Sequence, residues 1–376
     1  MYYFKKDIID NKKELYYIGI SNNQLIHKKT NLLLPYPVIE GLASYAFTSY
    51  SWFNVDNKQY VCFLDNKNGG DVYVSDDNVN FNYLDKMENL PPVHHKDRSC
   101  YFKNAYYYIM SKNIYKFSNQ QTSLLEGYTF DNGDYNGNSM DNIIGNDHSD
   151  VLLLQDYIKY PGDTYNTFRY YLIKDFSKGE KNFTNVGEYN VSEYRILGAN
   201  ISDDTAVICY RSKANDPAYS NMTSTNDLFV KVTKDYNNWE NYLIGDIGTD
   251  TQVVGSSDKL LQVLNGTWIL INSFRYYDIQ YQYIYKSNDG INWEKIYLDF
   301  DNTDEEMQKE KWIEMFKLDN KILLCQFKMN KSARNTCSKV VYIYDGNTLT
   351  RYNNLYNIGD KESLTVLDNI LYFKKN

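Results

Sequence analysis

A turn motif that recurs along this 376-residue chain constrains its fold more than any other feature. The motif is clearest at 287–293, where Ser-Asn-Asp-Gly-Ile-Asn-Trp separates two stretches of alternating apolar and polar residues. The segments 233–239 (Thr-Lys-Asp-Tyr-Asn-Asn-Trp) and 75–81 (Ser-Asp-Asp-Asn-Val-Asn-Phe) keep the same order of residue types. Each has a hydroxyl residue, an Asp two positions later and an aromatic residue four positions after the Asp. Such self-similarity predicts an architecture built from repeated structural units.

Weaker copies of the motif occupy the gaps, with anchors near residues 21, 118, 173 and 343. In the last of these Asp345 is followed by Gly, but Leu349 replaces the aromatic residue. In another, Asp175 follows an equivalent strand and a longer turn leads to Phe183. The anchors are about 54 residues apart on average, so seven units account for the chain.

Each unit has room for four short strands separated by turn residues such as Asn265-Gly266. Short antiparallel strands repeated in this way are typical of β-propellers, in which radial repetition leaves only short sheet edges exposed. We therefore predict an all-β fold, a seven-bladed β-propeller of four-stranded antiparallel blades, in a single domain over 1–376. We expect the N- and C-terminal strands to share one blade and close the ring. Six or eight blades remain open because the third unit is short, and residues 2–9 have no assigned place.

The composition limits the kind of partner. A formal net charge of −8 disfavours binding to phosphate backbones, so we expect no nucleic-acid partner. The 39 tyrosines fit a strand-rich fold, and either sheet packing or ligand recognition accounts for so many. We find neither the apolar core of a signal peptide nor an apolar run of membrane-spanning length. We expect a protein made in the bacterial cytoplasm, without membrane insertion.

The cysteines and histidines do not indicate a metal site or a disulfide framework. They are few and scattered, and no Cys-x-x-Cys pair is present. The adjacent His94 and His95 stand near Pro91-Pro92 in an expected loop, so we predict no metal and no cofactor. The residues concerned are Cys62, Cys100, Cys209, Cys325, Cys337, His27, His94, His95 and His148.

The recurring turn resembles the Asp box, or BNR repeat, of sialidases and related propellers. The resemblance is close at 287–293, fair at 233–239 and 75–81, and weak elsewhere. It implies a hairpin between the third and fourth strands of a blade, in which the Asp accepts backbone N–H groups of its own turn. It also implies a glycine at positive φ and an aromatic residue packed between blades. The residues given a structural role in this way are Ser75, Asp77, Phe81, Thr233, Asp235, Trp239, Ser287, Asp289, Gly290 and Trp293.

Sialidase activity does not follow from the resemblance. Sialidases bind the substrate carboxylate with three arginines, the first of them in an Arg-Ile-Pro motif near the N-terminus. Here no arginine precedes Arg98, and the nearest string, Arg195-Ile196-Leu197, lies in the wrong blade. Fold does not imply function. We therefore name no catalytic residue and expect a non-catalytic protein, although a hydrolase that uses another pair of carboxylates stays open.

Long loops at 157–167, 213–226, 274–280 and 331–337 predict where a ligand would bind. In sialidase-like propellers, the loops between the second and third strands lie on the functional face. These loops mix Tyr, Asn, Asp and Arg, residues that stack on sugar rings and bond their hydroxyls. The ligand-binding candidates are Tyr160, Tyr165, Arg169, Tyr219, Arg275, Tyr276 and Tyr277.

The favoured hypothesis is a binding propeller of a phage tail or tailocin from a low-GC Gram-positive host. It would recognise a cell-surface glycan or a neighbouring tail or baseplate protein, in several copies on a virion or tailocin particle. One alternative is a glycoside hydrolase or lyase acting on bacterial surface polysaccharide. The other is a purely structural assembly component. The sequence leaves the ligand, the propeller face used and the copy number undetermined.

Overall fold

The fold is given by a computed structural model that describes most of the chain. For β1, β20, β23, β26, β30 and β31, introduced below, the backbone alone is described. The described residues are 2–6, 13–21, 24–33, 50–64, 69–91, 99–110, 113–129, 139–146, 149–158, 160, 162–163, 166–191, 193–212, 227–246, 252–253, 261–271, 274–275, 283–297, 311–318, 321–328, 337–352, 362–367 and 370–375.

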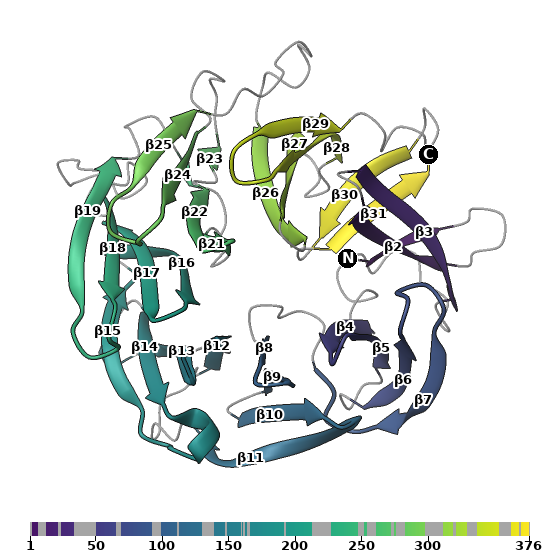
Figure 1. Ribbon diagram of the computed structural model, residues 1–376, viewed down its shortest axis with the longest axis horizontal. Helices are drawn as coiled ribbons and strands as arrows, with labels where there is room; N and C mark the ends of the chain where they lie inside the picture. The colour runs from purple at the N-terminus through teal and green to yellow at the C-terminus, as the bar shows by residue number, and fades with distance from the viewer. Residues whose placement is uncertain are drawn as a thin grey trace.

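The repeated unit is an antiparallel sheet of four strands, and such sheets stand side by side around a common centre (Figure 1). In each, the first strand lies nearest the centre and the fourth lies at the rim (Figure 1). The chain is an all-β propeller, as the sequence predicted.

Five sheets have four strands each. The first two are β4 (Tyr50–Val55), β5 (Lys58–Leu64), β6 (Gly70–Ser75) and β7 (Asn82–Met87), and then β8 (Ser99–Phe102), β9 (Ala105–Met110), β10 (Asn113–Ser118) and β11 (Gln121–Thr129). The third has β12 (Ser139–Asn146), β13 (Val151–Ile158), β14 (Thr167–Lys174) and β15 (Thr184–Asn190), with the 3-10 helix η2 (Phe176–Lys178) before β15. The fourth and fifth are β16 (Tyr194–Ser202), β17 (Thr205–Ser212), β18 (Asp227–Thr233) and β19 (Glu240–Asp246), and then β21 (Leu261–Leu264), β22 (Thr267–Ile271), β24 (Tyr283–Ser287) and β25 (Glu294–Tyr297). A short pair, β20 (Gln252–Val253) and β23 (Phe274–Arg275), accompanies the fifth sheet.

The remaining strands form one nine-stranded sheet. Its members are β26 (Lys311–Leu318), β27 (Lys321–Lys328), β28 (Cys337–Tyr344), β29 (Leu349–Tyr352), β30 (Glu362–Leu367), β31 (Ile370–Lys375), β1 (Tyr2–Lys6), β2 (Lys13–Ser21) and β3 (Gln24–Leu33). Pairing of Cys337 with Thr365 and of Ser338 with Leu364 joins the β26–β29 unit to the unit made by the two chain ends. Because these two units share one sheet, the count of seven blades stays a prediction.

The N- and C-terminal strands share a sheet, as expected, and the structure assigns a place to the first residues. β1 lies between β31 and β2, antiparallel to β2 from Tyr2 to Lys6 and parallel to β31 at Lys5. The unit formed by the chain ends therefore has five strands, β30, β31, β1, β2 and β3. The strand beyond the usual four is β1, inserted in the middle of the sheet.

Two-residue turns join the first and second strands of several sheets. Asp56-Asn57, Lys103-Asn104 and Asn265-Gly266 all adopt positive φ at both positions. Such turns match the right-handed twist of the strands that they connect, and Asn and Gly tolerate this conformation best. These tight turns lie at the same end of each sheet as the turn between its third and fourth strands, because the strands alternate in direction.

Apolar residues fill the space between neighbouring sheets. One cluster joins Val207 and Val230 of the β16–β19 sheet to Trp268 and Tyr285 of the β21–β25 sheet. Comparable clusters lie at four further boundaries, between β4–β7 and β8–β11, β8–β11 and β12–β15, β12–β15 and β16–β19, and β21–β25 and β26–β29. The four sheets β8–β11, β12–β15, β16–β19 and β21–β25 therefore bury both faces, and the buried strands β5 and β13 read as nearly continuous apolar runs.

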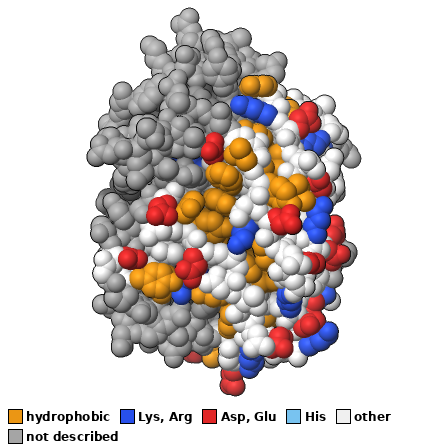
Figure 2. All heavy atoms as spheres, turned by 90° about the vertical axis from the view of Figure 1, so that its left-hand side faces the viewer, with side chains coloured by type: hydrophobic (Ala, Val, Ile, Leu, Met, Phe, Trp, Pro, Cys, Tyr) orange, Lys and Arg blue, Asp and Glu red, His pale blue; other side chains and the backbone are white. Residues whose placement is uncertain are grey.

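Among the described residues, all the exposed large apolar side chains except Tyr101 of β8 lie on outer strands. Leu243 on β19 and Tyr297 on β25 are 61% and 62% exposed, and Tyr83 on β7 and Leu124 on β11 are similarly open. Figure 2 shows one side of the rim, where apolar side chains are interspersed with acidic and basic ones. Charged neighbours on an edge strand oppose pairing with another chain.

Candidate functional site

The three closest copies of the turn motif form the same set of hydrogen bonds. In the turn between β24 and β25, Oδ1 of Asp289 accepts bonds from the backbone N–H groups of Ile291 (2.9 Å) and Asn292 (2.8 Å). Ser287 Oγ donates to Oδ1 (3.0 Å), and the Asn292 amide donates to Oδ2 (2.7 Å). One carboxylate thus accepts hydrogen bonds from two backbone N–H groups of its own turn and stabilises that turn.

The other two copies repeat these contacts at the hairpins β6–β7 and β18–β19. Asp77 accepts from the N–H groups of Val79 and Asn80 and from the Ser75 hydroxyl. Asp235 accepts from the N–H groups of residues 237 and 238 and from the Thr233 hydroxyl. These bonds require the ionised carboxylate, and they hold the pKa of Asp77 and of Asp235 well below the usual value. For Asp289, burial opposes the shift, but the same N–H donors still lower its pKa.

The residue after the Asp has positive φ in all three turns, but glycine is present in only one of them. Gly290 has φ +76°, whereas Asn78 and Tyr236 take the same place with φ +65° and +57°. The expectation of a glycine is therefore correct only at 290. There, a Cβ would lie 2.9 Å from Val207 Cγ2 of the preceding sheet, so close packing excludes a side chain.

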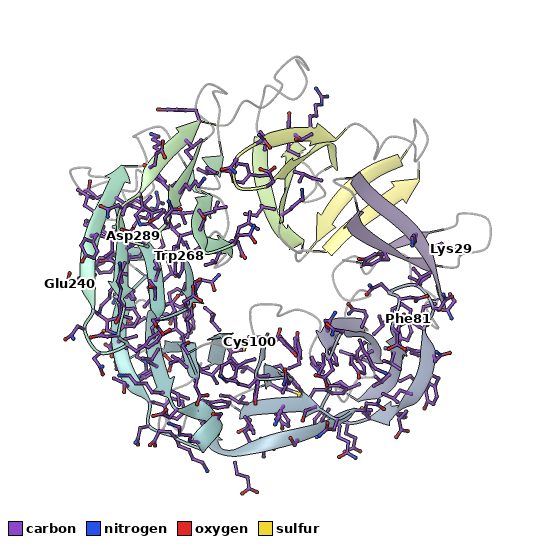
Figure 3. All side chains as sticks on the ribbon, in the orientation of Figure 1. Lys29, Phe81, Cys100, Glu240, Trp268 and Asp289 are labelled. Carbon is purple, nitrogen blue, oxygen red and sulfur yellow. The ribbon has the colours of Figure 1, made fainter. Side chains whose placement is uncertain are left out.

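The aromatic residues of the motif lie at boundaries between sheets. Trp293 packs against the cluster shared with the β16–β19 sheet, and its Nε1 donates to the Gly290 carbonyl (2.8 Å). Trp239 packs against the cluster shared with the β12–β15 sheet. Phe81 is buried, and its backbone N–H and C=O bond the Asn31 amide of β3, the last strand of the preceding unit. In Figure 3, Phe81 lies beside β7, facing the strand that carries Lys29.

The β14–β15 turn departs from the motif. Asp150, in the β12–β13 turn, accepts bonds from the backbone N–H (2.9 Å) and the hydroxyl (2.6 Å) of Ser177 in η2. Phe176 packs its ring against Phe102, Tyr107 and Tyr128 of the preceding sheet. The interpretation of Asp175 and Phe183 as a stretched copy of the motif misses these two residues, Asp150 and Phe176, which carry the contacts here.

The opposite end of the β12–β15 sheet carries a row of charged residues. Strand pairing places Asp156, Arg169 and Glu188 next to one another on β13, β14 and β15. Arg169 donates from Nε to Asp156 Oδ1 (2.9 Å) and from Nη2 to Oδ2, and the two side chains are only 8% and 2% exposed. Burial alone would lower the pKa of Arg169, but the bonds to Asp156 and its charge raise the pKa above its ordinary value.

Tyr160 connects this buried pair with the surface. Its hydroxyl donates to Glu188 Oε2 at 3.3 Å, and Arg169 bonds its oxygen. Burial and the Glu188 charge together raise the pKa of Tyr160. Glu188 is exposed, and its second oxygen accepts from the Asn185 amide at 2.8 Å. Beneath this row, Tyr171 lies 5.4 Å from the guanidinium, and burial followed by the Asp156 charge raises its pKa to about 12.

We name the set Asp156, Tyr160, Arg169 and Glu188 the loop-end cluster. The neighbouring register pair, Tyr157 and Phe168, lies on the other face of the sheet, where its two rings are 5.0 Å apart and Asn166 donates its amide to the Tyr157 hydroxyl. The partly exposed Tyr160 ring can stack on a sugar ring, and its hydroxyl and the Glu188 carboxylate can bond the hydroxyl groups of the sugar.

Two of the seven ligand-binding candidates, Tyr160 and Arg169, come together in this cluster. Arg275 pairs with Gln252 through the backbone of β23. Tyr165, Tyr219, Tyr276 and Tyr277 lie outside the described residues. Sequence reasoning missed Asp156 and Glu188. A signal for Asp156 was present, because Gln155-Asp156 interrupts the otherwise apolar run of β13.

Within the described ranges, no group of three or more His, Cys, Asp or Glu residues could hold a metal ion. The same residues contain no helix with the length and apolar character needed to cross a membrane. Cys62, Cys100 and Cys209 are in the reduced form. His94 and His95 lie outside the described residues.

No family model matches the chain, and no curated protein matches it. Among solved structures, it is similar to the Bombyx mori GH32 beta-fructofuranosidase BmSUC1 (12% identity, TM-score 0.35, 83% of this chain and 63% of that chain). It is also similar to the fungal lectin of Aleuria aurantia, a six-bladed β-propeller (9% identity, TM-score 0.39, 81% and 96%). A third is a mutant of AofleA from Arthrobotrys oligospora (9% identity, TM-score 0.38, 88% and 90%). The chain spans less than two thirds of the Bombyx mori protein, and similarity this low assigns neither a ligand nor an activity.

Proposed function

We propose that this chain is a non-catalytic binding propeller that recognises a cell-surface glycan through the loop-end cluster. The observation that carries the proposal is the exposed Glu188 carboxylate with the Tyr160 hydroxyl against it, above the buried pair Asp156 and Arg169. The buried pair fixes the position of the sheet end, while Tyr160 and Glu188 offer a hydroxyl and a carboxylate to a ligand. A rigid support below adaptable polar groups is a common arrangement in binding sites.

The biological setting that we propose is the tail or baseplate of a phage or tailocin of a low-GC Gram-positive host. The support comes from the sequence, which has the lysine-rich composition of such hosts and turn motifs like those of propellers often met in phage tails. Several copies on one particle would raise the avidity for a weak surface ligand. A neighbouring tail protein is the other partner that this setting provides.

The test is retention and cleavage of purified wall polysaccharides from low-GC Gram-positive bacteria by the full-length chain. We expect retention without release of shorter saccharides. Tyr160→Phe should lower the affinity by about fivefold, because each lost hydrogen bond to a ligand contributes on the order of 1 kcal/mol. Release of saccharides would support the hydrolase alternative instead.

Tyr101→Phe is the matched control. Tyr101 is partly exposed, and its hydroxyl also donates a 3.3 Å bond, to Asn104, but it lies at the opposite end of its own sheet, next to the β8–β9 turn. The Tyr101→Phe variant should bind the polysaccharide as the unmodified chain does. Equal losses of affinity in the two variants would contradict the proposed site. No retention of polysaccharide by the unmodified chain would contradict the proposed function.

A further inference from the structure

The loop-end cluster contains an arginine that is not available to an anionic ligand. Arg169 uses Nε and Nη2 to bind both oxygens of Asp156, and it also bonds the oxygen of Tyr160. Both members of the pair are almost completely buried. A ligand carboxylate or phosphate could take this arginine only by leaving the Asp156 carboxylate buried without its countercharge, which is strongly unfavourable. Arg169 therefore supports the site and does not clamp an acid.

Among the described residues of the cluster and its turn, the charges that remain accessible are negative. Asp156 and Arg169 neutralise each other, and Glu188 is exposed at the surface. Asp163 is also exposed, in the turn that its backbone N–H forms with the Tyr160 carbonyl (3.1 Å). Among the described residues that make up this site and its turn, no accessible cation balances these two carboxylates. The overall charge of −8 has the same sign. An anionic glycan would be repelled on approach and on contact.

The same groups suit the hydroxyl and amino groups of a sugar. The bond from the Tyr160 hydroxyl to Glu188 is 3.3 Å long, which is well beyond the usual length for O–H to O bonds. A ligand hydroxyl could replace this contact by accepting from Tyr160 and donating to Glu188 Oε2. A protonated amino group would gain a charge-assisted bond to the same oxygen.

From this arrangement we infer that the loop-end cluster selects neutral or amino-bearing saccharides and rejects acidic ones such as uronates, sialates and phosphate-substituted glycans. The inference rests on the proposed glycan-binding function and specifies its ligand class. It makes Glu188 the residue that determines the selection and Arg169 a positioning residue.

The experiment is a binding screen of the full-length chain on an array of bacterial oligosaccharides in three groups, neutral, amino-bearing and acidic. The best saccharide of each group is then titrated by calorimetry at low and high NaCl concentration. We expect binding from the first two groups only. The affinity for amino-bearing saccharides should fall with salt, and that for neutral ones should stay constant, because salt screens exposed charge pairs.

Glu188→Lys sharpens the test. It should weaken binding of amino-bearing saccharides at least tenfold and should permit measurable binding of acidic ones. Glu240→Lys is the control, because Glu240 is also an exposed carboxylate on an outer strand that accepts a tyrosine hydroxyl, from Tyr242. Glu240 lies at the rim on β19 (Figure 3), and its substitution should leave the binding profile unchanged.

The outcomes separate the two proposals. Binding of acidic saccharides by the unmodified chain would overturn the ligand class while leaving glycan binding in place. A profile that Glu188→Lys does not alter would overturn the assignment to this cluster. No binding of any saccharide would overturn the proposed function itself, and the ligand class with it. Thermal unfolding of both lysine variants checks that they fold as the unmodified chain does.

Discussion

The three closest copies of the turn motif and the loop-end cluster use carboxylates in different ways. At the turn end, Asp289 bonds only residues within three positions of itself in the sequence. At the loop end, Arg169 reaches Asp156 across 13 positions, and Tyr160 reaches Glu188 across 28. The turn is thus specified by a short local motif, whereas the loop-end cluster depends on the register of three strands. A local carboxylate stabilises one hairpin, and a cross-strand carboxylate can create a surface for a partner.

The largest expected effect comes from breaking the buried pair at the loop end. Arg169→Met leaves the Asp156 carboxylate buried without its countercharge and should reduce the free energy of unfolding by about 3–5 kcal/mol. Denaturant unfolding followed by tryptophan fluorescence measures this change. The double variant Asp156→Leu with Arg169→Met should recover most of the loss, because two apolar residues replace the pair. If Arg169→Met were as stable as the unmodified chain, the buried Asp156 carboxylate would not need Arg169 as its countercharge.

A smaller effect is expected at the turn end. Asp289→Ala removes the acceptor of four hydrogen bonds and should reduce the free energy of unfolding by about 2–3 kcal/mol, because bonds to a charged acceptor contribute more than neutral ones. Asp289→Asn keeps one acceptor oxygen and should lose less. Glycan affinity, measured on the folded fraction by calorimetry, should be the same in both variants as in the unmodified chain. A fall in glycan affinity would contradict the distinction between a turn that only stabilises the fold and a loop-end cluster that binds the ligand.

The smallest effect is the dependence of stability on pH. The pKa values of Asp77, Asp235, Asp289 and Asp345 are lower in the folded protein than their ordinary value, mainly through backbone N–H donors (for Asp289, against opposing burial). The contribution of these aspartates to the free energy of unfolding is present above their pKa in the unfolded chain, which is near 4. It is lost as the pH falls through their lower pKa values in the folded protein. The midpoint of thermal unfolding should therefore decline below about pH 4. Asp289→Asn, which cannot titrate, should show a shallower decline, and an equal slope would contradict this assignment.

The sequence was sufficient to predict the parts of the fold that local patterns encode. The alternation and the turn of 281–300 predicted the β24–β25 hairpin, and the Ser287 to Trp293 spacing predicted which residues meet there. Positive φ at Tyr236 could not be predicted, because burial of its ring and its 2.6 Å bond to the Asp203 carbonyl hold a residue that the turn itself disfavours.

The candidate site was predictable only in part. Tyr160 and Arg169 were identified from the composition of a long loop and its flanking strand. Glu188 was missed, because its place beside Arg169 follows from strand pairing and from the shift in register between Tyr170 and Tyr171. A single sequence does not show which residues of β14 and β15 pair, because the ends of the two strands are mostly polar and carry no apolar pattern that would fix their register.

The position of β1 has a consequence for how the ring is made during translation. Lys5 leaves the ribosome before the intervening sheets are synthesised, yet the strand beside it contains Phe373. The edge of β1 that pairs with β31 must therefore stay unpaired while the intervening sheets form. The seam is filled only when β31 has been synthesised, so a chain that lacks β31 would keep its stacked sheets but would present an unpaired edge to other chains.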